Sequence, residues 1–369
     1  MSDLDRLRLA RAEGVGPVAY RRLMARFGTA AAALAALPEL ARAGGRASPP
    51  RIPSPGDIRR EIDRVADLGG RLLFQGDPLY PPLLARLDDA PAVIAVLGDP
   101  AVLSRRAVAV VGSRNASANG QRIAEALAAD LAAAGVVVVS GLARGIDAAA
   151  HRAALRTGIT VACVAGGPDI TYPPEHRDLQ AAIAEAGAIV AELPPGTQPQ
   201  ARHFPRRNRI IAGLALGVVV VEAAPRSGSL ITARLAAEAG REVFAVPGSP
   251  LDPRARGANS LIRDGAHLTE TAQDVLEALP VDAGRMRGQL GLSETQAAFG
   301  PDTGLTGAEH TQALAAVIAL LGAAPTAVDD LIRRCQLSAP AVLSVLLDLE
   351  IAGRIETLPG NRVALLGEG

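Results

Sequence analysis

Short apolar runs and longer helical patterns alternate through the centre of the chain, from about residue 60 to residue 275. Apolar runs without a polar alternation are typical of strands buried on both faces, and helices between such strands indicate a parallel sheet. The pattern therefore predicts an α/β fold with a Rossmann-like, doubly wound, mostly parallel sheet. The predicted strands are Ala107–Val111, Val136–Val139, Thr160–Val164, Ala188–Ala191, Val218–Val221 and Glu242–Val246. The predicted helices include Gly120–Ala134, Ile146–Arg156, Glu175–Ala186 and Leu230–Ala239.

The two ends of the chain show helical patterns of other kinds. Residues 1–45 predict a small all-α domain around the turn Gly14-Val15-Gly16-Pro17. This turn either grips DNA phosphates, as half of a helix-hairpin-helix, or serves only in packing. Residues 309–369 predict three helices closed by a β-hairpin, which is the winged-helix pattern. The third helix, from near Ser338 to Ile351, lacks basic residues and carries Asp348 and Glu350, so it suits packing or a protein contact better than a DNA groove.

Two stretches rich in turn-forming residues separate these patterns and predict linkers. One is rich in Gly, Pro and Ser, and the other in Gly and Thr. The predicted organisation is a helical domain at 1–45, a linker at 46–58, an extended Rossmann domain at 59–277, a linker at 278–308 and a winged-helix domain at 309–369.

Composition limits the class of protein and the kind of partner. All 38 basic residues are arginines and equal the 38 acidic residues, so the net charge is zero and a polyanion would need a local basic patch. The two cysteines, Cys163 and Cys335, lie far apart in the sequence, and their spacing does not fit a metal site. A chain with so few cysteines suits a reducing compartment. We see no signal-peptide pattern and no apolar run near the ~18 residues that span a bilayer, so we expect a cytoplasmic protein with no metal and no cofactor.

Residues 202–209 form the most concentrated basic segment, with four arginines, one phenylalanine and no acid. Guanidinium groups suit phosphates, and an aromatic ring suits stacked bases. His203 lies inside this segment, where contact with a phosphate is a better expectation than proton transfer. Phe204 either stacks on a base or packs in the core, and we predict an exposed loop around it. Arg207 contacts phosphate or pairs with an acid inside the fold.

Four predicted strands end in loops that carry Gly with Ser or Asp, and three of these loops carry Arg. Ligands of such sheets bind beyond the carboxyl ends of the strands, where loops and helix N-termini present N–H groups to anions. These loops therefore predict a cleft that binds phosphates. The loops are 112–115, 140–147, 166–169 and 226–229.

Enzyme fingerprints are absent from the sequence. It contains no G-x-G-x-x-G after the first strand, no Walker motif and no metal-binding His or Cys cluster. Asp147 and His151 lie four residues apart on one helix, as either a catalytic dyad or, in our preferred interpretation, a local hydrogen bond.

The alternative function is a nucleotide phosphoribohydrolase, although Pro225–Thr232 lacks the double Gly and the Glu of the P-G-G-x-G-T-x-x-E loop. A third interpretation makes the winged helix a reader of duplex DNA.

Several motifs in one order identify a family resemblance. The segments VVGSRNAS, SGLARGIDAAAH, GGPDITYPPEH, FPRRNRIIAGL, PRSGSLITARLA and GANSLIRDGA strongly resemble the DNA-processing protein A family (DprA/Smf). The resemblance covers residues 60 to 270, and the helical and winged-helix domains also occur in that family. It implies a dimeric protein, joined through its Rossmann domain, that binds single-stranded DNA, protects incoming DNA in natural transformation and loads the recombinase RecA. It implies no catalytic activity.

The resemblance also implies which residues contact DNA. The Gly-Ser-Arg motif and the Phe-Pro-x-Arg-Asn-Arg motif are expected against the DNA backbone, with Phe204 beside a base. Pro174 stands where many members have lysine, so a phosphate contact there depends on Arg177. The complete predicted DNA-binding set is Gly112, Ser113, Arg114, Ser140, Gly141, Arg144, Gly167, Arg177, Arg202, His203, Phe204, Arg206, Arg207, Asn208, Arg209, Ser227, Gly228 and Ser229.

Overall fold

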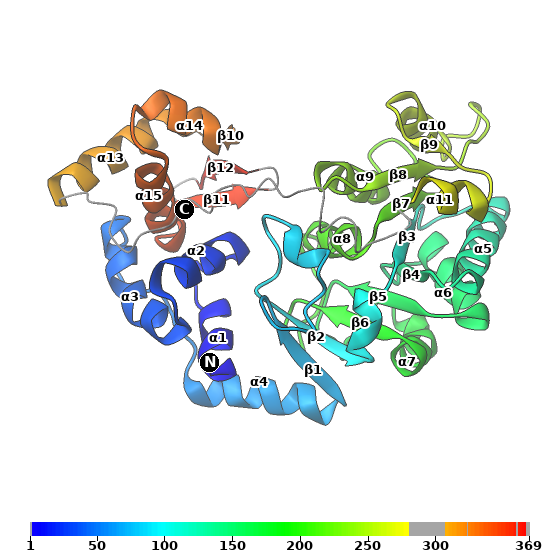
Figure 1. Ribbon diagram of the computed structural model, residues 1–369, viewed down its shortest axis with the longest axis horizontal. Coiled ribbons are helices and arrows are strands. Elements are labelled where there is room, and N and C mark those ends of the chain that lie inside the picture. The colour runs from blue at the N-terminus through cyan, green and yellow to red at the C-terminus, as the bar shows by residue number, and fades with distance from the viewer. Residues whose placement is uncertain (1, 280–306, 323, 359–360, 367–369) are drawn as a thin grey trace. The chain divides into compact units, whose positions relative to one another are not determined.

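The chain forms two compact units in a computed structural model that describes residues 2–279, 307–322, 324–358 and 361–366 (Figure 1). The central unit comprises residues 61–284, and the terminal unit comprises residues 1–60 and 285–369. Helix α4 (Pro55–Asp67) begins within the predicted first linker, and nearly all of the predicted second linker lies outside the described residues. The predicted domain boundaries therefore stay predictions.

A nine-stranded, mostly parallel sheet forms the core of the central unit. Its strand order is β1-β2-β6-β5-β4-β3-β7-β8-β9, and only the pairs β1–β2 and β2–β6 are antiparallel. This sheet and its flanking helices confirm the predicted Rossmann-like α/β class (Figure 1). The strands are β1 (Gly70–Phe74), β2 (Val93–Gly98), β3 (Ala107–Val111), β4 (Val137–Ser140), β5 (Thr160–Val164), β6 (Ala188–Ala191), β7 (Gly217–Val220), β8 (Glu242–Ala245) and β9 (His267–Leu268).

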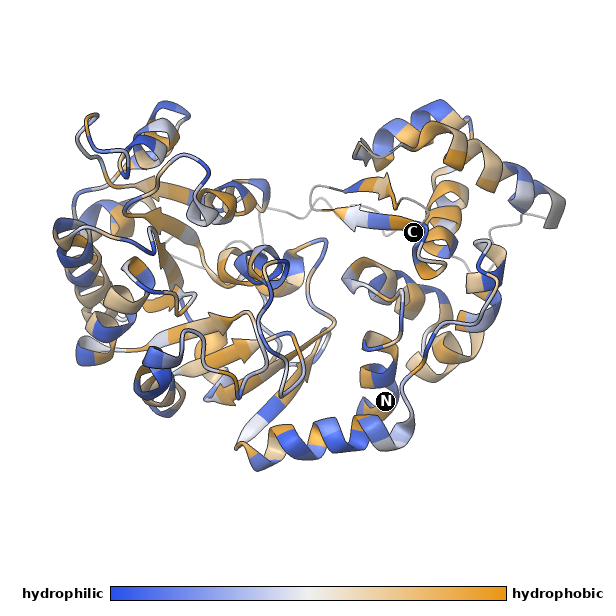
Figure 2. Ribbon diagram, turned by 180° about the vertical axis from the view of Figure 1, so that it is seen from behind, coloured by the Kyte–Doolittle hydropathy of each residue, from blue (hydrophilic) through white to orange (hydrophobic). Residues whose placement is uncertain are grey.

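Helices follow most of these strands and cover both faces of the sheet. Consecutive residues of β5 face opposite sides of the sheet. Cys163 joins the core that contains Ile210, whereas Ala162 joins the core that contains Ile183. Orange apolar residues accordingly line the strands in Figure 2. The elements between the strands are α5 (Ala118–Ala133), α6 (Ile146–Thr157), α7 (Arg177–Ala186), α8 (His203–Leu214), α9 (Gly228–Glu238), α10 (Arg256–Arg263) and α11 (Ala272–Ala278), with short 3-10 turns η1 (Leu84–Arg86), η2 (Pro100–Ser104) and η3 (Pro174–His176).

The six predicted strands match the observed strands within one residue at each end. Strands β1, β2 and β9 at the two edges were not among the predictions. The exposed loop predicted around Phe204 was wrong, because His203–Leu214 is helix α8. Pro205 obscured this helix in the sequence, but a proline is tolerated in the first turn, where its missing N–H has no helical partner.

The terminal unit contains both ends of the described chain. Its small sheet has the order β10-β12-β11, and three helices accompany it, as predicted for a winged helix. Thr326 lies in β10, and the N-cap position of α14 falls to Ala327. The elements are α1 (Asp3–Ala10), α2 (Pro17–Phe27), α3 (Ala30–Ala43), α13 (Gly307–Leu320), β10 (Thr326–Ala327), α14 (Val328–Cys335), α15 (Ala339–Ile351), β11 (Ile355–Leu358) and β12 (Arg362–Leu365).

Helix α15 packs against α2 and α3 as well as against its own winged-helix core. At Gly14, whose φ is +78°, an added Cβ would lie 2.7 Å from the carbonyl oxygen of Ile351. Asp348 and Glu350 are both buried, and burial raises the pKa of each carboxyl. Asp348 lies 2.7 Å from the ring of His310. The acidic end of α15 is therefore a packing surface, in agreement with its lack of basic residues.

Within the described residues, no single helix is long and apolar enough to cross a membrane. Helices α2 and α3 reach the required length and hydropathy only as a pair, and they are bent by 110° at the break between them.

Candidate nucleic-acid interface

The loops after β3, β4 and β7 meet at the carboxyl edge of the sheet, because these strands are parallel neighbours or next-neighbours in the strand order. The N–H of Ile146, the first residue of α6, donates to the carbonyl of Ser113, in the loop after β3, at 3.2 Å. The Asn208 amide of α8 donates to the carbonyl of Gly228 at 3.3 Å. These contacts bring the predicted loops together around the first turns of α8 and α9.

Five of the predicted arginines are exposed, and so is Gly228 in the loop after β7. Arg144 forms an ion pair with Glu175, and both side chains are more than half exposed. An exposed ion pair of this kind contributes little stability, so a phosphate can replace the carboxylate at small cost. The exposed arginines are Arg114, Arg144, Arg177, Arg202 and Arg206.

Phe204, in the first turn of α8, is half-buried and surrounded by three side chains. The guanidinium of Arg114 lies 4.8 Å from the centre of its ring, and that of Arg207 lies 6.0 Å away. The Tyr172 ring lies 5.8 Å away at an interplanar angle of 59°. Cations over an aromatic face and tilted aromatic pairs are both favourable. Phe204 therefore links the loops after β3 and β5 to α8.

Arg207 points into the fold and is only 6% exposed. Its guanidinium donates to the carbonyls of Gly141 and Cys163, the latter at 2.5 Å. Burial lowers the pKa of Arg207, and the nearby Asp147 carboxylate opposes this shift. Arg207 is therefore internal, but its hydrogen-bond partners are backbone carbonyls and not the acid of the second alternative, and it holds the ends of β4 and β5 together.

Arg209 is likewise 6% exposed. Its guanidinium lies 2.5 Å from the Glu192 carboxylate and 3.7 Å from that of Asp89, and it also donates to the Asp89 carbonyl. The structure thus gives Arg209 an internal partner on each side. The phosphate contacts predicted for Arg207 and Arg209 have no support from this geometry, and we leave both out of the proposed DNA surface.

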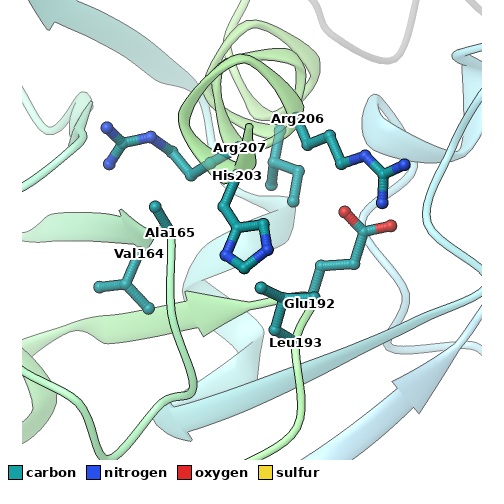
Figure 3. Close-up of a pocket in the computed structure, with 8 residues that line it drawn as sticks. Val164, Ala165, Glu192, Leu193, His203, Arg206 and Arg207 are labelled. Carbon is teal, nitrogen blue, oxygen red and sulfur yellow. The ribbon is translucent and has the colours of Figure 1, made fainter. Parts of the chain in front are cut away.

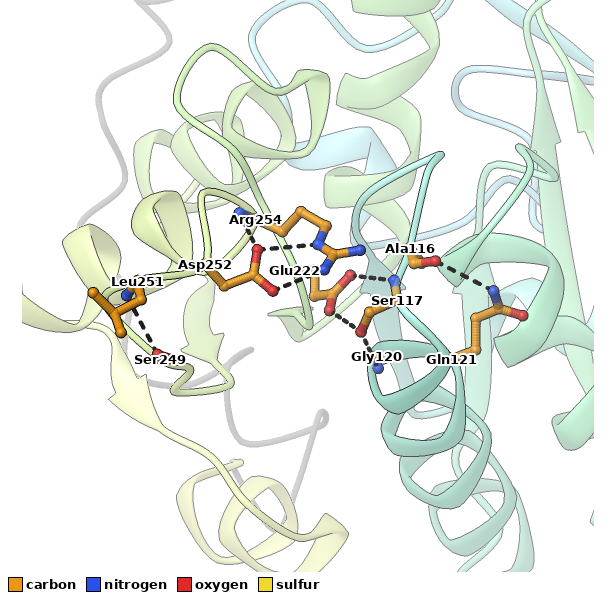
Figure 4. A network of polar contacts seen from close by, with 9 residues as sticks. All are labelled: Ala116, Ser117, Gly120, Gln121, Glu222, Ser249, Leu251, Asp252 and Arg254. Carbon is orange, nitrogen blue, oxygen red and sulfur yellow. Dashed lines mark hydrogen bonds and ion pairs between the residues drawn. The ribbon is translucent and has the colours of Figure 1, made fainter.

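Two helix N-termini at this edge already hold carboxylates of the chain itself. At α5, Glu222 accepts hydrogen bonds from the Ser117 N–H at 2.9 Å and from its hydroxyl at 2.5 Å (Figure 4). At α6, Asp147 accepts from the N–H groups of Gly141 and Ala143 at 3.1 and 3.3 Å. Each carboxylate takes the place that a nucleotide phosphate occupies at such a turn.

The N-terminus of α9 is more open. Ser227 caps the helix through its Oγ, which accepts from the Ser229 N–H at 3.4 Å and lies 2.7 Å from the Ser229 hydroxyl. An added Cβ on Gly228 would meet nothing within 4 Å. Among the three described helix N-termini at these loops, α9 therefore offers backbone and hydroxyl groups that an anion can reach.

His151 and Asp147 form neither the predicted hydrogen bond nor a dyad. The His151 Nδ1 instead lies 2.7 Å from the Thr160 hydroxyl, which donates to the Val138 carbonyl at 2.7 Å. Nδ1 must therefore carry the proton. Burial is the main cause that lowers the pKa of His151 to about 3, so this ring is neutral at ordinary pH. Burial raises the pKa of Asp147, and Arg207 opposes this shift.

His203 lines a small pocket beside α8, together with Glu192, Arg206 and Arg207 (Figure 3). The ring is 8% exposed, and its Nδ1 accepts the Gln200 N–H at 3.2 Å. Burial, followed by Arg202 and Arg206, lowers its pKa, so His203 is neutral. Arg206 and Arg207 extend to opposite sides of the helix in Figure 3. His203 is a structural neighbour of the exposed arginines and is itself covered.

The remaining predicted residues shape the loops from inside. The buried Ser140 hydroxyl donates to the Val110 carbonyl at 2.6 Å. A Cβ at Gly112 would lie 2.6 Å from Ile146, and one at Gly167 would lie 2.6 Å from the Pro194 carbonyl. The two glycines therefore let adjacent segments pack closely at the base of the loops, and the neighbouring loop residues are the ones that can face a ligand.

Three residues of this region escaped the sequence analysis: Tyr172, Glu192 and Glu222. Tyr172 is 53% exposed and follows the third loop, so an aromatic residue beside a predicted phosphate loop was the available signal. Glu192 and Glu222 had no local signal, because their partners Arg209 and Ser117 come from distant segments.

Comparisons with known proteins agree along most of the chain. Residues 71–280 match the DNA recombination-mediator protein A family, residues 1–63 the DprA-like N-terminal HHH domain and residues 301–361 the DprA winged helix domain. Protein Smf of Escherichia coli is 41% identical over 293 residues, which cover 78% of this chain and 75% of that protein. The DNA processing protein DprA of Streptococcus pneumoniae is 47% identical over 201 residues, covering 54% and 71%.

Two solved structures are also similar. DNA processing protein A from S. pneumoniae superposes with a TM-score of 0.59 at 42% identity and covers 62% of this chain and 80% of that one. DNA processing protein A from Helicobacter pylori, described with its single-stranded DNA binding mode, has a TM-score of 0.51 at 29% identity and covers 56% and 94%. The order of the motifs, the sheet and the three matched domains lead to one conclusion: this chain belongs to the DNA recombination-mediator protein A (DprA/Smf) family.

Proposed function

We propose that this chain binds single-stranded DNA without sequence preference, at the carboxyl edge of its parallel sheet. The observation that carries the proposal is the group of exposed arginines around the first turn of α8, above all Arg114 and Arg206. Phosphate contacts supply affinity that is independent of sequence, and stacking on an aromatic ring tolerates every base. Relatives named as DNA processing proteins, one of them described with single-stranded DNA, support this function.

A binding role accounts for the site better than the alternative phosphoribohydrolase. Glu222 and Asp147 are carboxylates at this edge, but Glu222 is occupied by hydrogen bonds from Ser117, in the segment after β3, and Asp147 by hydrogen bonds from its own loop. A buried, neutral His151 that bonds Thr160 has no path to a substrate. We therefore propose that the chain acts by holding DNA and not by hydrolysing it.

The cellular role follows from the family. We propose that the chain works in the cytoplasm, protects incoming single strands during natural transformation and passes them to the RecA recombinase. We further propose a homodimer joined through the central unit. Leu268 on the edge strand β9 is 52% exposed and Leu251 is 88% exposed, so the central unit has apolar side chains available for a contact between copies.

The test compares binding of one labelled oligonucleotide, single-stranded and as a duplex, across a salt series. We expect tighter binding of the single strand, and Arg206→Ala should lower the log–log salt slope by roughly 0.7 through the loss of one phosphate contact. Arg156→Ala is the matched control. This arginine is also exposed, but it lies in the last turn of α6, which runs away from the site. Equal affinity for both DNA forms, or equal slopes for both variants, would refute the proposal.

A further inference from the structure

Tyr172 is the aromatic side chain most open to solvent beside the exposed arginines. Its side chain is 53% exposed, whereas Tyr20 and Tyr80 are 2% and 4% exposed. A large aromatic side chain that stays in water forgoes the stabilisation that burial would give, so its exposure beside a basic site indicates a binding role. The Tyr172 loop follows β5 and ends at η3, which places the ring at the carboxyl edge of the sheet.

Phe204 is less available than Tyr172. Two guanidinium groups and the Tyr172 ring lie within 6.0 Å of its centre. A base that stacked on Phe204 would have to displace Arg114 or compete with Tyr172. A base that stacks on Tyr172 needs no such rearrangement, and its phosphate comes within the reach of the exposed Arg114.

We infer that Tyr172 provides the stacking surface for a DNA base, and that Phe204 is a positioning residue that holds Tyr172 and Arg114 in place. This inference rests on the proposed single-stranded DNA function and adds to it a residue and a division of roles. The tilted Tyr172–Phe204 pair holds the tyrosine ring, and Tyr172 stays 53% exposed and so available to a base. Arg114 supplies the cation for the adjoining phosphate.

The chain carries its own reporter for this stacking. It has three tyrosines and no tryptophan, and two of the tyrosines are buried. Stacking of a base on Tyr172 should therefore quench tyrosine emission when oligothymidylate is added to the full chain. Binding itself is followed independently by the anisotropy of a labelled oligonucleotide.

Tyr172→Ala should weaken binding roughly 5- to 150-fold, the range for the loss of one stacked base, and should remove the quenching. Tyr172→Phe retains a ring and should bind within about twofold of the unchanged chain, since the phenol oxygen is not needed for stacking. An oligonucleotide of the same length with abasic sugars keeps the phosphates. For that ligand, Tyr172→Ala should make no difference.

The role of Phe204 is separated from that of Tyr172 by a double-mutant cycle. If Phe204 acts through Tyr172, Phe204→Leu should weaken binding in the unchanged chain and have little further effect in Tyr172→Ala. An equal loss in both backgrounds would show that Phe204 itself stacks, and it would overturn the division of roles. Thermal unfolding of each variant identifies any loss that comes from misfolding.

The failure of this inference is distinguishable from the failure of the proposed function. No anisotropy change with any single strand would refute the function. Normal anisotropy binding with unchanged tyrosine emission, and undiminished affinity in Tyr172→Ala, would refute the role of Tyr172 and leave the function intact.

Discussion

The guanidinium of Arg209 lies 2.5 Å from the carboxylate of Glu192, with only 8% of the arginine side chain exposed. The two residues join the middle of α8 to the segment that follows β6. The sequence predicts Arg209 as a DNA contact, but in the structure this arginine stabilises the elements that carry the site.

Arg209→Ala should lower the free energy of unfolding by about 1–3 kcal/mol, because it leaves the half-covered Glu192 without its partner. The salt slope of DNA binding should stay unchanged. Arg206→Ala, three residues earlier and exposed, should cost less than about 0.5 kcal/mol and should lower the slope. Urea unfolding and binding titrations measure both quantities. A lower slope in Arg209→Ala with full stability would place Arg209 on the DNA.

Gly141→Ala should destabilise the central unit by about 1–3 kcal/mol through overpacking. A Cβ there would lie 2.5 Å from a guanidinium nitrogen of Arg207, which is itself buried and bonded to two carbonyls. Gly228→Ala is the control at a neighbouring loop, where a Cβ meets nothing within 4 Å. Differential scanning calorimetry should show a lower melting temperature for the first variant alone. Equal melting temperatures would mean that Arg207 moves aside freely.

The free energy of unfolding should fall as the pH is lowered, because of the buried His151. Its pKa is about 3 in the folded chain and near 6.5 when unfolded, so the unfolded state binds the extra proton between these values. The contribution is fully present above pH 6.5 and is lost as pH falls, by up to about 1.4 kcal/mol per pH unit. His151→Asn keeps a donor for Thr160 and removes the titration. The difference in unfolding free energy between the two chains should therefore depend on pH below 6.5, and a constant difference would contradict burial of a neutral ring.

Gly14→Ala should destabilise the terminal unit more than Gly28→Ala. Both glycines have a positive φ, of +78° and +70°, so both variants bear the strain of about 1–2 kcal/mol that a side chain meets there. Only at Gly14 would the new Cβ meet a backbone atom, the Ile351 carbonyl oxygen at 2.7 Å, because Gly28 has open space. Thermal unfolding of the two variants isolates the contact with α15. Equal losses would show that this packing does not contribute to stability in solution.

The sequence was sufficient for the six strands β3 to β8 of the sheet but not for the direction of the arginines. Valine-rich runs such as Val108 to Val111 fit only a strand with both faces covered, and β3 lies there. The segment 202–209 carries no such constraint while it is taken as a loop. Once it is a helix, the spacing of four residues places His203 and Arg207 on one inward face, whereas Arg202 and Arg206 lie about 100° around the axis and are exposed.

The roles of Glu192 and Glu222 could not be predicted from the residues next to them in the sequence. Glu222 and Glu192 follow buried strands and look like ordinary polar residues at strand ends. Their significance depends on which loops the strand order makes neighbours, and β3 and β7 are neighbours only because the order reverses around β3. The pairing of Glu222 with Ser117 is a result of topology and not of sequence spacing.

The contact of Gly14 with Ile351 has a consequence for synthesis of the chain on the ribosome. The central unit is an insertion within the terminal unit, whose first helices are translated long before their partner α15. At ~5–20 residues per second, the roughly 300 residues between them take about 15–60 s to make. During that interval the N-terminal helices exist without the acidic helix that later covers them, and the terminal unit is completed only after α15 has been made.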